Sequence, residues 1–186
     1  DTALRIFSTL NDRGLPLSDS DIFKAQFYQY YKQKSEDDRD EFIKDWKKLE
    51  ETCEKIFHPI TGTPMDDLFT RYMYFIRAKR DNNKSSTTES LRRFYERDKY
   101  SVLKQDDTFE NLKDLAQFWE DITDQNRERF SEGVLKKLFI LNYAPNSMWN
   151  YFISVYYLAN RTEDGKLDDE DFKMFLDRTI AFIWGY

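Results

Sequence analysis

The sequence predicts an all-α protein, a bundle or array of about eight or nine helices. Its 186 residues include only five Gly and four Pro, whereas a β-sandwich or barrel needs a turn every 8–12 residues or so. It contains 16 Phe, 12 Tyr and 4 Trp but only three Val, and strands favour β-branched residues. Apolar side chains also recur every three or four positions, as on the buried face of a helix. The length suits one domain over residues 1–186 with a substantial core.

Residues 1–34 are expected to form a helix, a tight corner and a second helix. An apolar stripe ends before Gly14, where a helix C-terminus favours glycine, and Pro16 prevents the first helix from continuing. Ser18 is the predicted N-cap of the second helix, with Asp21 at its N3 position and a hydrophobic staple across the turn. The second helix should run to about Gln33.

The next two helices have equally clear beginnings. Ser35 should cap a third helix, whose first turn is acidic, as the helix dipole prefers. Pro64 suits the first turn of a fourth helix. The polar segment 81–88 predicts a loop. Five further helices are expected over about 88–98, 108–130 and 132–142, from Ser147 through Tyr157, and from Asp168 to the C-terminus.

Scarce residue types exclude several chemistries. The glycines are too widely spaced for a phosphate-binding loop. One Cys and one His exclude a multi-cysteine zinc site and a two-histidine metal site within this chain. Cys53 lies on an apolar stripe and should be a core residue, and His58 should be a cap or surface residue. No apolar run is long enough for a membrane span, so we expect a soluble, cytoplasmic chain with no metal, no cofactor, no membrane partner and no catalytic residue.

The corner between the first two helices holds two residues that its geometry does not require. Asn11 and Arg13, next to Gly14, place an amide and a guanidinium on a loop between helices. One interpretation is structural only: the corner fixes two helices against each other. The same groups could instead bind a phosphate or contact a neighbouring domain.

From Ile6 to Lys24 the chain resembles the segment that follows the catalytic core in GmrSD-type restriction endonucleases, in the pattern Ile-Phe-x-x-Leu-Asn-x-Arg-Gly-x-x-Leu-Ser-x-x-Asp-Ile-x-Lys. Members of that family carry an upstream Asp-Gly-Gln-Gln-Arg motif, in a ParB-like domain tied to nucleoside triphosphate hydrolysis. Many also carry a C-terminal His-Asn-His nuclease. Neither motif occurs here.

The resemblance therefore implies the helical middle part of a longer protein that recognises and cuts modified phage DNA. Its partners would be the missing N-terminal and C-terminal domains. Nucleoside triphosphate and divalent metal would belong to the parent protein. Asn11, Arg13 and Gly14 would form a nucleotide-contact or domain-contact loop.

A basic segment stands out in a chain whose net charge is −6. Residues 77–104 contain nine basic and four acidic residues, so this segment could contact DNA phosphates. The alternative is a solvated helix pair with ordinary ion pairs. The candidate DNA contacts are Arg77, Lys79, Arg80, Lys84, Arg92, Arg93 and Arg97.

Two further patterns have a functional and a structural interpretation. Residues 160–171 partly follow the layout of an EF-hand calcium loop. Asn160, Thr162 and Asp171 are poor matches to three of its ligand positions, and a helix–turn–helix corner explains the same residues and is favoured. The aromatic run from Trp149 to Tyr157 could stack bases, although its helical spacing favours core packing.

The first functional hypothesis is thus a non-catalytic subdomain that supports an absent nucleotide-hydrolysing domain and contacts DNA. The second is a helical protein-interaction scaffold with no nucleic-acid role. A third, a stand-alone helical enzyme, would need a titrating site that the sequence does not indicate.

Overall fold

The computed structural model describes residues 17–80 and 90–185. The predicted first helix, the 81–88 loop and Asn11, Arg13, Gly14 and Lys84 lie outside the described residues. Within those residues the all-α prediction is confirmed, with eight α-helices, one 3-10 segment and no strand. The elements are α2 (Asp19–Lys34), α3 (Glu36–Ile56), α4 (Pro64–Lys79), α5 (Leu91–Glu96), η1 (Arg97–Lys104), α6 (Thr108–Thr123), α7 (Glu132–Leu141), α8 (Met148–Asn160) and α9 (Asp169–Trp184).

The helix starts follow the predicted capping residues. Ser18 caps α2 in a capping box with Asp21, and Ser35 caps α3 by accepting the N–H of Asp38. Pro64 occupies the first turn of α4, which is capped by Thr63. At the starts of α2, α3 and α4, side-chain oxygens thus accept from N–H groups that the first turn of a helix leaves without a partner.

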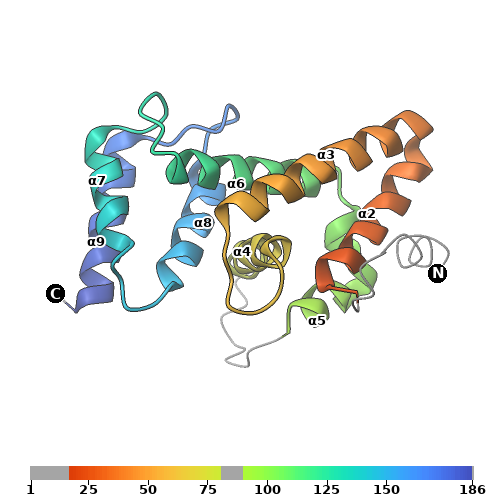
Figure 1. The fold of residues 1–186 in the computed structure, drawn as a ribbon, viewed down its shortest axis with the longest axis horizontal. Helices are drawn as coiled ribbons and strands as arrows, with labels where there is room; N and C mark the ends of the chain where they lie inside the picture. The colour runs from red at the N-terminus through yellow and green to blue at the C-terminus, as the bar shows by residue number, and fades with distance from the viewer. Residues whose placement is uncertain (1–16, 81–89, 186) are drawn as a thin grey trace.

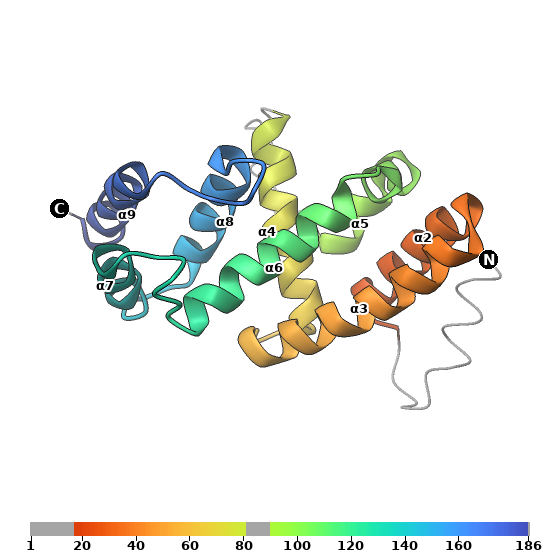
Figure 2. The same cartoon turned by 90° about the horizontal axis from the view of Figure 1, so that it is seen from above.

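The molecule is elongated, with a helix pair at each end (Figures 1 and 2). The antiparallel helices α2 and α3 lie at one end, beside α5 and η1, and α7 and α9 lie side by side at the other. Helices α4, α6 and α8 join the two ends, and α6 crosses α4 (Figure 2). The N-terminal and C-terminal helices of the described chain are therefore far apart.

One continuous hydrophobic cluster runs through these layers. Phe27 contacts the rings of Phe42, Trp46, Phe69 and Phe109, and so joins α2 to α3, α4 and α6. Such tilted ring contacts contribute about 0.5–1.5 kcal/mol each beyond their area burial. The abundance of aromatic residues in the sequence is thereby explained as core packing.

Two predicted helices end earlier than expected. The helix expected over 108–130 stops at Thr123, because Gln125 adopts a left-handed φ of 51° and the side chain of Asn126 accepts the N–H groups of Glu128 and Arg129. Of the helix expected over 88–98, the structure forms only the six residues of α5, Leu91–Glu96. Asp98, Lys99 and Tyr100 have φ values of 59°, 55° and 62°, which interrupt the helix within η1.

Candidate functional site

The described half of the Gly14 corner is anchored to the start of α4. Ser20 donates its N–H to Asp66 Oδ1 at 2.9 Å, and its hydroxyl lies 3.3 Å from that of Thr63. Asp66 Oδ2 also accepts the N–H of Thr63 at 3.0 Å. The N-termini of α2 and α4 are thus tied together by one carboxylate.

The predicted DNA-contact residues differ in their location, pairing and exposure. Arg77, Lys79 and Arg80 lie at the C-terminal end of α4, where cations suit the helix dipole. Arg77 lines an apolar groove. Arg92 is paired with Asp19 at 2.9 Å, as the structural alternative expects. Lys79, Arg80, Arg93 and Arg97 are exposed.

An apolar groove of about 790 Å³ lies between α4, α8 and α9. We call it the α4–α8–α9 groove. Its walls are mostly aromatic and aliphatic, and among the described residues the charged ones that line it are Arg77 and Arg178. Part of the predicted aromatic run forms one wall, through Tyr151, Phe152 and Tyr156, while Trp149 and Tyr157 are buried in the core. The prediction that this aromatic run packs in the core is therefore confirmed for Trp149 and Tyr157 only.

Exposed apolar side chains are concentrated on and next to α7, α8 and α9. Met148 and Phe182 line this groove, and Phe139, Ile140 and Tyr143 line a second hollow with Ile180 and Trp184. Of the eight large hydrophobic residues that are exposed in the described chain, six lie between Phe139 and Phe182. We call these six the C-terminal apolar surface. Globular proteins rarely leave large apolar patches exposed unless they contact a partner. Its members are Phe139, Ile140, Tyr143, Met148, Met174 and Phe182.

A second hollow, of about 830 Å³, lies between the α3–α4 loop, α4, the end of α6 and the start of α8. We call it the Arg71 cleft, after the residue that contributes its buried charge. Its lining is more polar than that of the groove and includes the exposed side chain of His58, as predicted for a surface histidine. It also includes three amides, from Gln125, Asn142 and Asn150.

Arg71 is only 6% exposed and contacts two aromatic rings. Its guanidinium carbon is 4.1 Å from the centroid of the Phe57 ring and 4.6 Å from that of the Trp119 ring. Nη2 donates to Asp67 at 3.2 Å, whereas Nε and Nη1 are buried with no acceptor among the described residues. Burial lowers the pKa of Arg71, and the neighbouring Asp67 carboxylate opposes this effect. Each unmade hydrogen bond of a buried polar group costs about 1–3 kcal/mol.

Sequence reasoning missed Arg71. The only signal was a single Arg within the apolar stretch of α4 that otherwise supplies Leu68, Phe69, Tyr72 and Met73 to the core. Because a helix surface of ordinary polarity also contains arginines, that signal could not distinguish a buried guanidinium from an exposed one. The ring contacts come from Phe57 and Trp119, which are distant in sequence.

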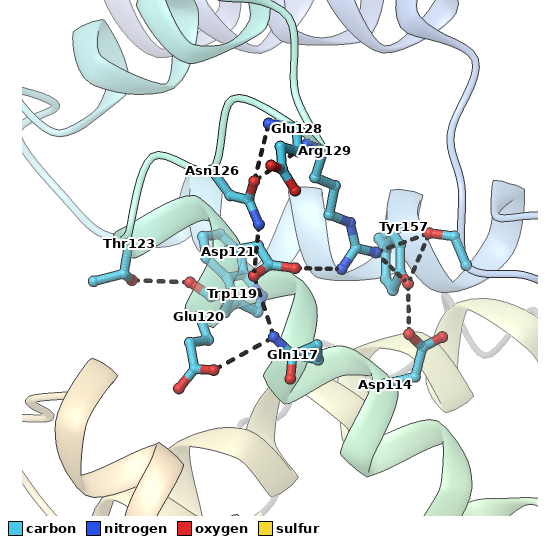
Figure 3. A network of polar contacts seen from close by, with 11 residues as sticks. Asp114, Gln117, Trp119, Glu120, Asp121, Thr123, Asn126, Glu128, Arg129 and Tyr157 are labelled. Atoms are coloured by element: carbon cyan, nitrogen blue, oxygen red, sulfur yellow. Dashed lines mark hydrogen bonds and ion pairs between the residues drawn. The ribbon is translucent and has the colours of Figure 1, made fainter.

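A polar network fixes the loops around the end of α6 (Figure 3). Arg129 donates to Asp121 at 2.9 Å, to the Tyr157 hydroxyl at 2.9 Å and to the Gly165 carbonyl at 2.8 Å. Tyr157 in turn donates to Asp114 at 2.6 Å. Burial, and then the hydrogen bond to Asp114, raise the pKa of Tyr157. Every member has a partner within the chain, so the network is structural.

The EF-hand-like segment is part of the same corner. Gly165 adopts a φ of 76°, and its carbonyl accepts from Arg129. The Asp164 carboxylate contacts Thr162 and Lys166. Throughout the chain as described, no group of three His, Cys, Asp or Glu side chains is placed to hold a metal ion. These contacts agree with the corner interpretation of residues 160–171.

No family model, curated protein or solved structure significantly matches this chain. Among its described helices, none combines the length and the apolar character needed to cross a bilayer.

Proposed function

We propose that this chain is a non-catalytic helical support domain that docks a neighbouring protein domain on its C-terminal apolar surface. The observation that carries the proposal is that six large apolar side chains on and next to α7, α8 and α9 are exposed, among them Phe139, Tyr143 and Phe182. Burying apolar surface contributes about 25 cal/mol per Å², and aromatic residues are common anchors of interfaces.

The sequence pattern from Ile6 to Lys24 supports a more specific assignment. We propose that the parent is a bacterial, cytoplasmic restriction or phage-defence protein of the GmrSD type. The corner with Asn11 and Arg13 would then contact the ParB-like domain. The tie between Ser20 and Asp66 supports this role, because it anchors the second half of the corner to the core.

The two docking regions would serve different neighbours. Helices α2 and α3 lie at one end of the molecule, and α7 and α9 lie at the other (Figure 1). We propose that the domain preceding the chain in its parent contacts the corner and that the following domain covers the C-terminal apolar surface. Nucleotide hydrolysis and DNA cleavage would be activities of those domains.

Calorimetric titration of this chain with the domain that follows it in the parent reading frame tests the proposal. Phe182→Asp should weaken binding at least about tenfold, equivalent to about 1.4 kcal/mol. Ile43→Asp changes an exposed apolar residue on α3 and should leave binding unchanged. Absence of binding, or equal losses in both variants, would contradict the docking role.

A second candidate function, DNA contact, is favoured by one observation. Lys79, Arg80 and Arg93 are exposed and form no ion pair with any residue of the described segments. Cations that are not neutralised by the chain itself remain available for phosphates.

Fluorescence anisotropy with a duplex at low salt tests this second candidate. Arg93→Glu should weaken binding and reduce its salt dependence, because fewer counterions are released. Lys44→Glu, which makes the same charge change on exposed α3, should have a smaller effect. If the unaltered chain does not bind at low salt, only the docking role remains.

A further inference from the structure

The Arg71 cleft is not used by the docking role, yet it contains the most unusual side chain of the described core. Arg71 is almost fully buried, and Nε and Nη1 lack an acceptor among the described residues. Most buried polar groups in proteins have a hydrogen-bond partner. A buried guanidinium with spare donors beside a large cleft therefore points to a ligand that supplies acceptors.

The charges around the cleft decide which acceptor fits. The two oxygens of Asp66 accept the N–H groups of Ser20 and Thr63, and Asp67 accepts from Arg71. These carboxylates would repel a dianion such as phosphate more strongly than a monoanion. A carboxylate is a planar monoanion that matches the planar donors of a guanidinium.

The size and walls of the cleft indicate what is attached to that carboxylate. A volume of about 830 Å³ is much larger than a carboxylate group alone. The lining combines the ring of Tyr151 with the amides of Gln125, Asn142 and Asn150. Pockets that pair aromatic walls with a few polar groups are typical of small organic ligands.

We propose that the Arg71 cleft binds a small organic carboxylate, whose oxygen accepts a hydrogen bond from a guanidinium donor of Arg71. The ring contacts with Phe57 and Trp119 hold the guanidinium of Arg71 in place at the wall of the cleft. Because Nε and Nη1 are covered here, binding requires a local side-chain movement. Tyr151 is half-buried and lines the cleft, so it is the side chain that we expect to move.

Titration of the ¹⁵N-labelled chain with benzoate at constant ionic strength tests this proposal by NMR. We expect saturable shifts of the Trp119 and Trp149 indole signals, with a Kd on the order of 1 mM. Arg71→Lys should weaken binding at least tenfold, since a lysine offers neither the planar donors nor the same stacking. Arg178→Lys, in the α4–α8–α9 groove, is the matched control and should bind as the unaltered chain does.

Gln125→Glu keeps the proposal testable if Arg71→Lys does not fold. It adds a carboxylate to an exposed lining residue and should weaken benzoate binding several-fold by repulsion. Equal shifts with benzyl alcohol or with chloride, tighter binding of inorganic phosphate, or unchanged binding in both variants would overturn the proposal. None of these outcomes bears on the docking role of the C-terminal apolar surface.

Discussion

The carboxylate of Asp66 accepts the backbone N–H of Ser20 at 2.9 Å, although the two residues are 46 positions apart. The same carboxylate completes the capping box of α4 with Thr63. One side chain therefore both caps its own helix and positions the first turn of α2.

Replacing Asp66 should cost more stability than the loss of an ordinary helix cap. Asp66→Ala removes the acceptors of two N–H groups, and we expect a loss of about 2–3 kcal/mol in the free energy of unfolding. Asp37→Ala removes a first-turn acid of α3 for which the structure records no side-chain hydrogen bond, so it should cost less than about 1 kcal/mol. Urea denaturation followed by circular dichroism measures both, and equal losses would refute the double role of Asp66.

A substitution at Lys99 should stabilise the protein. Its φ of 55° costs a residue with a side chain about 1–2 kcal/mol, which exceeds the extra chain entropy that glycine loses on folding. Lys99→Gly should therefore raise the free energy of unfolding by up to about 1 kcal/mol. Lys44→Gly, within helix α3, should lower it by about 1 kcal/mol. Thermal unfolding of the two variants distinguishes these outcomes. A lower stability in Lys99→Gly would contradict the left-handed conformation of Lys99.

Tyr157→Phe should destabilise the corner around Gly165 while keeping its ring packing. The hydroxyl donates to Asp114 at 2.6 Å and accepts from Arg129 at 2.9 Å, whereas the stacking on Phe118 does not involve it. We expect a loss of about 1–2 kcal/mol in the free energy of unfolding. The exposed Tyr143 provides the matched control, and Tyr143→Phe should change stability by less than about 0.5 kcal/mol. Chemical denaturation measures the stability of both variants. Equal losses in Tyr157→Phe and Tyr143→Phe would show that the network contributes nothing to stability.

The contact between the starts of α7 and α9 should weaken at acid pH. A hydrogen bond from Ser131, and then the contact with Lys173, lower the pKa of Asp169. A carboxylate with a lowered folded-state pKa contributes stability above its unfolded pKa, near 3.9, and loses it as the pH falls through the folded value.

Asp169→Asn should therefore be less stable than the unaltered chain at pH 7, and the two should converge as the pH falls through the lowered folded-state pKa of Asp169. Denaturant midpoints across this range measure the effect. The matched charge control is Asp177→Asn, which removes another exposed acid of α9, one that pairs with Lys137. A difference between Asp169→Asn and the unaltered chain that persists unchanged at low pH would contradict the assignment.

Local signals in the sequence predicted most of the fold. Ser18, Ser35, Pro64 and Asp168 begin helices where their capping chemistry places them. The early end of α6 was missed because the segment between Ile122 and Phe130 contains neither Gly nor Pro, the usual signals that a helix ends. The left-handed residues 98–100 were missed because none of them is glycine, the usual signal for positive φ.

The candidate sites were harder to predict than the fold. The α4–α8–α9 groove exists because three helices leave a hollow between them, and the aromatic run alone does not say which rings face it. The partner of Arg92 is Asp19, a residue 73 positions away. Charge counting along the chain could indicate a basic segment, but it could not show which charges the fold neutralises.

Cys53 provides a natural probe of how often this core opens. It is the only thiol in the sequence and is fully buried on α3, and burial raises its pKa above the ordinary value. Because alkylating reagents attack the thiolate, they can react only after the surrounding helices separate. The alkylation rate of the unmodified protein therefore measures the frequency of that separation, without an introduced label.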